Sequence, residues 1–315
     1  MWGALLTHQL DVYSQNNDIV GNSHGGGGAV DSRSVRIFSE DPADSMSRQL
    51  ARYIRDVAGK FVPGHLVRLI AREDRFGRGG DHTAYNRLGF TAVRITESKE
   101  NYSRQHSLAD TLDGVDFEYL VKNARVNAAA LFSLAAAPAA PVVRDAHGPM
   151  LSRGGIAHGD PEEISSLRNY DATLKWFSVP EAVQYRVVLR GGWALDWERS
   201  VVVTATTEPM KTHTLLNVSI DDFIFGVSAI GANGFESLVS PFIRPPGAWE
   251  LPPVVNKNAP SPTSSTGLPV APKLGDVLGV SIGFLVGGMV GFASRKSGWQ
   301  DTRRYAGLAR GDVEE

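Results

Sequence analysis

The 315-residue sequence contains no cysteine, which excludes disulfides and thiolate metal sites. A metal ion would therefore need His, Asp or Glu ligands. The formal net charge is -2 and no stripe of basic residues stands out, so we expect no nucleic-acid partner. The glycine run at residues 24–28 is not followed by Lys-Ser or Lys-Thr, which excludes a phosphate-binding P-loop. The first residues lack the basic start and long apolar core of a signal peptide.

Strand and helix patterns alternate over the first region of the chain, 1–137. Short apolar runs predict strands, helical spacing predicts an amphipathic helix at 45–58, and an alanine-rich stretch predicts a second helix at 117–136. These strands are expected at residues 35–38, 67–70 and 91–96. Such alternation is typical of an α/β fold with a mostly parallel sheet and flanking helices. Asp18 follows an apolar-polar run, so we expect it at the tip of a strand, where chemistry gathers in open α/β sheets.

The pattern changes at residue 138. Residues 138–165 are rich in Pro, Ala, Gly and Asp and predict a linker. Short runs with a period of two follow within 166–245, which is typical of an all-β sandwich. These runs lie at 174–176, 185–189, 201–203, 213–215 and 223–227. Residues 246–273 are rich in Pro, Ser, Asn and Thr and predict a disordered spacer.

Residues 274–294 predict a transmembrane helix, because 277–293 contain no charge and would form a helix about 26 Å long. Glycines recur every fourth residue, at 275, 279, 283, 287 and 291, a pattern that favours close helix pairing in lipid and hence a homodimer. Basic residues open the tail 295–315, which places it in the cytoplasm and the main domains outside. The alternatives are a soluble core helix or a flexible tail, and a chain whose segment does not span would be secreted.

Candidate acid/base or metal-binding groups lie in three polar stretches of the first region: Asp18, Asp81, His82 and His106. Each alone is a weak signal, because an Asp at a strand tip is often a cap and a His in a loop is often only solvated. The residue types leave two interpretations open, a convergent site or a polar rim.

Together these stretches resemble the C-terminal half of the di-zinc aminopeptidase family, which includes aminopeptidase Y and bacterial leucyl aminopeptidases and belongs to the glutamate carboxypeptidase clan. The resemblance covers about residues 12–135 and implies a zinc exopeptidase-like fold. It rests on Asn16-Asn17-Asp18-Ile19-Val20-Gly21, on Asp74 to His82 with Leu88 to Arg94, on Glu100-Asn101-Tyr102 with Gln105-His106, and on Val115 to Leu120.

By this resemblance Asp18 would bind one of two zinc ions and His106 the other. Asp81 and His82 would match the family's Ser-Asp-His segment beside the metals, with Gly80 in place of the Ser. In such hydrolases two metal ions activate one water molecule and polarise the scissile carbonyl of a peptide substrate. A Glu takes the proton of that water molecule.

The sequence departs from the family before Asp18. No His-x-Asp pair, bridging Asp or Glu-Glu pair precedes it, and the first Glu is Glu40. We therefore expect a truncated or partial peptidase that retains no catalytic residue and does not hydrolyse peptides by itself.

The second region resembles a fibronectin type III module, through Leu174-Lys175-Trp176, Tyr185-Arg186-Val187 and Asp222 to Ala229. Trp193 and Trp197 of this region either pack on the sandwich or form a binding surface. Two functions compete for the whole chain. The first is a fragment of a membrane-anchored, zinc-dependent aminopeptidase. The alternative is a non-catalytic, membrane-anchored binding or adhesion protein with a degenerate peptidase scaffold.

Overall fold

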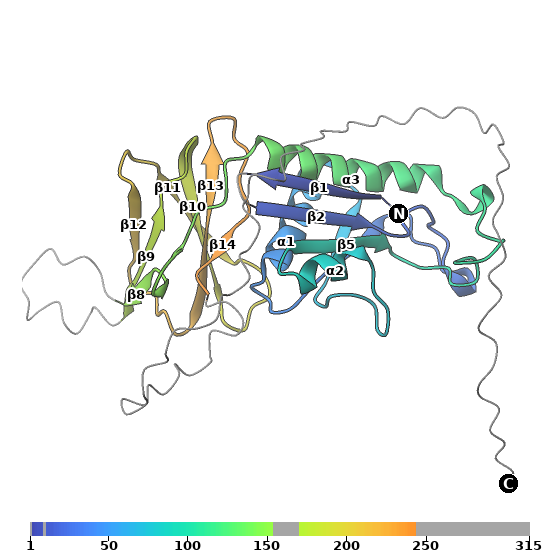
Figure 1. Ribbon diagram of the computed structural model, residues 1–315, viewed down its shortest axis with the longest axis horizontal. Helices are drawn as coiled ribbons and strands as arrows, with labels where there is room; N and C mark the ends of the chain where they lie inside the picture. Colours follow the sequence, from blue (N-terminus) through green and yellow to red (C-terminus); the bar gives the residue numbers. More distant parts are fainter. Residues whose placement is uncertain (1, 9–10, 154–169, 244–315) are drawn as a thin grey trace, which may run out of the picture. The chain divides into compact units, whose positions relative to one another are not determined.

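A computed structural model describes residues 2–8, 11–153 and 170–243 of the chain, and side chains from residue 13 onward (Figure 1). All of these residues belong to one structural unit, Met1–Leu251. The linker, spacer, transmembrane and tail predictions for 154–169 and for residues beyond 243 fall outside the described residues. Among the described helices, none is long and apolar enough to cross a membrane.

The first region is a five-stranded sheet with three α-helices. Its strands are β1 (Trp2–His8), β2 (Asp11–Asn17), β3 (Ser34–Ser39), β4 (Leu66–Ile70) and β5 (Thr91–Glu97). The helices are α1 (Met46–Phe61), α2 (Asp81–Arg87) and α3 (Phe117–Ala136), and two short 3-10 turns occupy Gly26–Gly28 and Leu112–Gly114. The predicted strands and helices are confirmed, and α3 has the predicted bounds. The first strand, β1, is an addition to the predicted set.

The prediction of a mostly parallel sheet is wrong, because the sheet is mixed. The strand order is β1-β2-β5-β3-β4; β2–β5 and β3–β4 pair in parallel, whereas β1–β2 and β3–β5 pair antiparallel. A parallel return needs a crossover of a dozen or more residues that runs the length of the sheet. The long helix α1 makes such a crossover between β3 and β4. The connection 71–90 is also long enough for such a crossover but contains only the seven-residue α2, and β5 runs opposite to β3.

Each of the two longer helices, α1 and α3, begins with a side chain that caps its first turn. Ser45 caps α1 by accepting a hydrogen bond from the Arg48 backbone N–H, and Asp116 caps α3 by accepting one from Tyr119. The apolar faces of both helices pack on one face of the sheet, where Ile37, Ile95, Leu50, Ile54, Val126 and Ala130 are fully or almost fully buried. Alternation along β5 sends Arg94 to the opposite face, toward residues 74–82.

The second region contains two antiparallel sheets around a shared apolar cluster. One sheet has the order β11 (Arg199–Thr204), β10 (Ala182–Gly191), β13 (Phe223–Gly231), β14 (Ser240–Pro241). The other has the order β12 (Met210–Leu215), β9 (Ala172–Phe177), β8 (Leu151–Arg153). A short hairpin, β6 (Arg144–Asp145) with β7 (Gly148–Pro149), precedes β8. Fully or almost fully buried Trp176, Tyr185 and Phe225 lie in the cluster between the sheets. Strands form at all five predicted positions, but β11 is exposed at every residue except the half-buried Val203, so the predicted period of two is not seen in its burial.

Candidate functional site

A cavity of about 610 Å³ lies beside the end of β2 and is lined by Asp18, Asp81 and His106. Because β2 and β5 are parallel, their carboxyl ends share one edge of the sheet, and Asp18 pairs its backbone N–H with Ile95 O at 3.1 Å. The loop after β5 brings His106 to the same place. Three of the four candidate residues from distant parts of the sequence therefore line one cavity.

Backbone outliers lie at one expected ligand, His106, and directly after the other, Asp18. Ile19, directly after Asp18, has a φ of 67°, and His106 itself has a φ of 57°. Positive φ is uncommon for residues other than glycine, and for a β-branched residue such as Ile it is a genuine outlier. Outliers of this kind gather at binding and catalytic sites, where the surrounding structure holds them in place.

Arg94 holds the Asp18 side chain. Its guanidinium is fully buried and lies 2.9 Å from an Asp18 carboxylate oxygen and 2.9 Å from an Asp74 carboxylate oxygen. Arg94 thus links the strand tip to the loop that precedes α2. Burial raises the pKa of the Asp18 carboxyl, and the nearby carboxylates of Asp74, Asp81 and Glu100 act in the same direction, whereas Arg75 opposes them.

The ion-pair network continues through Glu100. This buried carboxylate lies 2.6 Å from Arg36 and 2.6 Å from Arg75, and 3.3 Å from Arg78. Arg75 also lies 3.1 Å from Asp74, which closes the network back to Arg94. The buried charges of this network are therefore paired, which limits their desolvation cost.

His82 and Asp81 lie next to each other in the chain but have different surroundings. His82 is fully buried; its Nε2 lies 2.9 Å from Glu73 O and 3.5 Å from an Asp74 carboxylate oxygen. Asp81 is the exposed first residue of α2 and lines the cavity. The structure thus brings Asp81 to the cavity, while His82 contacts the loop that carries Asp74.

Glu97 was not named as a site residue from the sequence, although it lines the cavity. Its carboxylate is almost completely buried and accepts a hydrogen bond from the Asn22 backbone N–H at 3.0 Å. Burial raises the pKa of Glu97 to about 7, against the opposing effect of backbone hydrogen bonds from Asn22 and Asn101. A carboxyl group that titrates near neutral pH is suited to accept and donate protons. The available signal was the charge of Arg94 and Glu97 in a strand whose centre carries the apolar residues Ala92, Val93 and Ile95.

The described residues do not form a complete zinc site. A catalytic zinc ion takes three protein ligands and a structural one takes four. The described part of the chain contains no group of three or more His, Asp or Glu residues arranged to hold a metal ion. Asp18 also already shares its carboxylate with Arg94. Asp18 and His106 alone therefore do not fit the donor set that two zinc ions require.

Comparison with known proteins places this chain near a group of fungal proteins. It is 32% identical over 261 residues to a "Probable zinc metalloprotease" of Pyrenophora teres f. teres, covering 72% of this chain and 49% of that protein. Similar proteins occur in Leptosphaeria maculans, with 32% identity over 76% of this chain and 58% of the relative, and in Pyricularia oryzae, with 33% identity over 70% and 47%. No protein-family model matches the chain.

The similarity reaches beyond the first region. The match covers 72% of this chain, whereas the predicted peptidase-like region, 1–137, makes up less than half of it. Part of the sequence after that region is therefore shared with these relatives. The chain spans about half the length of the curated relatives it matches, and it is related to fungal proteins named probable zinc metalloproteases.

Proposed function

We propose that this chain is the later part of a zinc-dependent peptidase of the aminopeptidase type, to which Asp18 and His106 each contribute one ligand of a different metal ion. The observation that carries the proposal is that these residues, far apart in the sequence, line the same cavity. The names of the fungal relatives support the peptidase class and zinc. The substrate would be the N-terminal end of a peptide, with Asp81 and His82 in supporting positions.

We further propose that the 315-residue chain alone does not hydrolyse peptides. The earlier ligands and the general base expected from the family resemblance have no counterpart before Asp18, and the first Glu of the sequence is Glu40. Asp18 and His106 leave each metal ion with a single ligand from this chain. Tight binding of two zinc ions requires further donors.

Zinc titration and a hydrolysis assay test these statements separately. Chelator-treated chain is titrated with zinc by calorimetry and assayed on aminoacyl-nitroanilides with excess zinc. We expect weak zinc binding that decreases in both Asp18→Ala and His106→Ala, no change in the control His147→Ala, and no turnover by any form. His147 is exposed at the β6–β7 turn, as His106 is exposed in its loop, but His147 does not line the cavity.

Two outcomes of these experiments would contradict the proposal. Turnover that disappears in His106→Ala would show that the chain contains a complete active site. Zinc binding that is unchanged in either Ala variant would remove that residue from the set of ligands.

The second candidate function is a non-catalytic, membrane-anchored binding or adhesion protein. It is favoured by the ion pair that engages Asp18 and by the lack of a three-residue metal cluster among the described residues. Two antiparallel sheets with a shared core support the likeness of the second region to a fibronectin type III module. If the chain binds no zinc at all, this function replaces the peptidase proposal.

For either function we propose that residues 274–294 anchor the chain in a membrane, with the main domains outside the cytoplasm. The uncharged run and the basic residues after it support this proposal. The glycine stripe would then favour a homodimer. Carbonate washing of cell membranes tests the anchor, because release of the intact chain into the soluble fraction would show that the segment does not span.

A further inference from the structure

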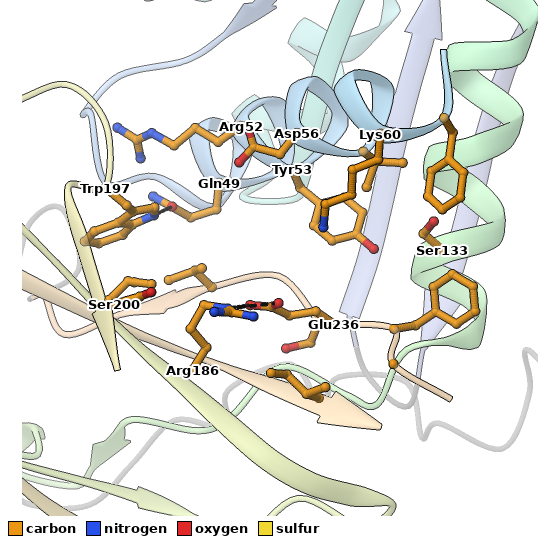
Figure 2. Close-up of a pocket in the computed structure, with 18 of the residues that line it drawn as sticks. Gln49, Arg52, Tyr53, Asp56, Lys60, Ser133, Arg186, Trp197, Ser200 and Glu236 are labelled. Carbon is orange, nitrogen blue, oxygen red and sulfur yellow. Dashed lines mark hydrogen bonds and ion pairs between the residues drawn. The ribbon is translucent and has the colours of Figure 1, made fainter. Parts of the chain in front are cut away.

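A second cavity, of about 840 Å³, lies between α1 and the outer face of the sheet that contains β10 (Figure 2). Alternation along β10 creates this face: Tyr185 and Val187 point into the sandwich core, whereas Arg186 and Val188 line the cavity. Figure 2 shows Tyr53 and Lys60 of α1 on one side of the space and Arg186, Ser200 and Glu236 on the other. Among the described residues, none lines both this cavity and the one beside Asp18.

Contacts between α1 and the second region hold the cavity in shape. Trp197 donates a hydrogen bond from its indole Nε1 to Gln49 at 3.2 Å, and the buried Arg190 forms an ion pair with Asp44. The Nη1 atom of Arg55, in α1, also donates to both carboxylate oxygens of Asp196, at 2.9 and 3.0 Å. The walls are therefore preformed, as in most small-molecule sites, and the volume lies in the usual range for such sites.

Contacts between α3 and the β13–β14 connection add to this support. The side-chain amide of Asn233 donates to Ala136 O at 2.7 Å. The rings of Phe132 and Phe235 meet edge to face, with centroids 5.5 Å apart. Asn233 and Phe235 also line the cavity, so its shape depends on both long helices.

The carboxylates of the lining already have partners. Glu236 lies 3.0 Å from Arg186 and accepts a hydrogen bond from the Ser228 hydroxyl at 2.5 Å. Asp56 is paired with Arg55, which does not line the cavity, at 2.9 Å. Glu198 accepts a hydrogen bond from the Gly191 backbone N–H at 2.8 Å. All three carboxylates of the lining therefore have partners within the protein itself.

Three cationic side chains of the lining, Lys60, Arg199 and Arg52, retain hydrogen-bond donors that a ligand could use. Lys60 and Arg199 make no ion pair with any residue in the described part of the chain, and Arg199 lies over the Phe223 ring at 4.7 Å. Arg52 is almost completely buried, and its Nη1 and Nε have no hydrogen-bond acceptor among the described residues, although Nε lies 3.6 Å from Asp196. Burial and the like charge of Arg190 lower the pKa of Arg52 to about 10, whereas Asp196 and Asp44 act in the opposite direction.

The net charge of the side chains that line the cavity indicates which ligand charge they favour. Four cationic side chains, Arg52, Lys60, Arg186 and Arg199, face three carboxylates, Asp56, Glu198 and Glu236, so the excess is one positive charge. One negative charge on a ligand neutralises this excess, whereas a doubly charged phosphate would overshoot it. Aromatic rings of Tyr53, Phe61, Trp197 and Phe235 supply apolar surface for the rest of the ligand.

We propose that this cavity binds an amphipathic monocarboxylate, a ligand with one carboxylate and an apolar or aromatic body. Two sources share this chemistry: the free carboxyl end of a short apolar peptide, and a free aromatic monocarboxylic acid. Lys60 and Arg199 contact the carboxylate, and the aromatic lining contacts the body. This site is separate from the cavity beside Asp18 and does not depend on zinc.

Calorimetric titration of the full chain tests the proposal. The probes are acetyl-Leu-Phe with a free carboxylate, its carboxyl-terminal amide, and 3-phenylpropionate. We expect the free acid to bind and the amide to bind about tenfold more weakly, since a hydrogen bond to a charged group is lost. Tighter binding of the peptide than of 3-phenylpropionate identifies the peptide as the source, and the reverse order identifies the free acid.

Variants of single cations assign the binding to the cavity. Lys60→Gln removes one spare cation from an exposed position of α1, and Arg125→Gln is the control, because it removes an exposed cation of α3 outside the lining. We expect about tenfold weaker binding of the acid in Lys60→Gln and no change in Arg125→Gln. Arg199→Gln provides a second test if Lys60→Gln melts at a lower temperature than the unmodified chain.

Three results would overturn the proposal: equal binding of acid and amide, no binding of either at millimolar concentration, or equal affinity of the acid for the unmodified chain and for folded Lys60→Gln and Arg199→Gln. In each case the cavity would be only a solvent-filled gap between layers.

Discussion

Replacement of Glu97 by Gln should remove a pH-dependent loss of stability. Glu97 is almost completely buried at the cavity beside Asp18, and burial raises its pKa from 4.5 to about 7. Between these two values the folded chain binds more protons at Glu97 than the unfolded chain does. The folded state is therefore favoured by this group at low pH, and that contribution is lost as the pH rises through about 7.

The magnitude follows from the difference between the two pKa values. A tenfold change in proton affinity corresponds to about 1.36 kcal/mol, so the rise of the Glu97 pKa from 4.5 to about 7 amounts to about 3 kcal/mol between fully acidic and fully alkaline conditions. About 2.5 kcal/mol of this change falls between pH 5 and pH 9, because the unfolded group is already mostly ionised at pH 5. Gln keeps the shape and one acceptor oxygen for the backbone N–H of Asn22 but does not ionise.

Urea unfolding at pH 5, 7 and 9 measures the effect in the unmodified chain, in Glu97→Gln, and in the control Glu208→Gln, which alters an exposed carboxyl group. We expect the free energy of unfolding of Glu97→Gln to rise relative to the unmodified chain by about 2.5 kcal/mol from pH 5 to pH 9. The control should follow the unmodified chain. Parallel curves for all three proteins would refute the argument, because Glu97 would then titrate alike in both states.

Two further substitutions test the buried polar contacts. Arg94→Met leaves the carboxylates of Asp18 and Asp74 without their buried partner. It should lower the free energy of unfolding, measured with urea at pH 7, by about 3–5 kcal/mol, and a loss under about 1 kcal/mol would contradict the network. Tyr119→Phe removes the hydroxyl that donates to Ser34 O at 2.8 Å and accepts from Ser98 N at 3.1 Å. The free energy of unfolding should fall by about 1–3 kcal/mol in the same assay, and the control Tyr85→Phe should lower it less.

Hydrophobic periodicity predicted the helices and most strands well, because each pattern is local. The helix over 117–136 has the predicted bounds, and α1 continues to Phe61 rather than ending at residue 58. Strand β1 was not predicted, because Leu5 and Leu6 interrupt the alternation that indicates a strand. Strand direction could not be read from the same patterns, because alternation of strands and helices does not encode the direction in which the chain re-enters the sheet.

The candidate site was predicted in part. The family resemblance placed Asp18, Asp81 and His106 together, and the structure brings all three to one cavity. It could not indicate the partner of Asp18, because Arg94 lies far from Asp18 in the sequence and reaches it only through the parallel pairing of β2 with β5. Periodicity marked Arg94 only as a residue of a strand.

The ion pairs beside this cavity give the carboxylates of Asp18, Asp74 and Glu100 cationic partners. Arg94 joins Asp18 to Asp74, and Glu100 lies between Arg36 and Arg75, so each of these carboxylates already has a cationic partner. A metal centre that organises its own domain would leave its carboxylate ligands mutually repelling until the ion arrives. Here the repulsion is relieved by Arg36 of β3, Arg94 of β5 and Arg75 of the loop after β4. Any zinc ion at Asp18 would therefore compete with Arg94 for the carboxylate.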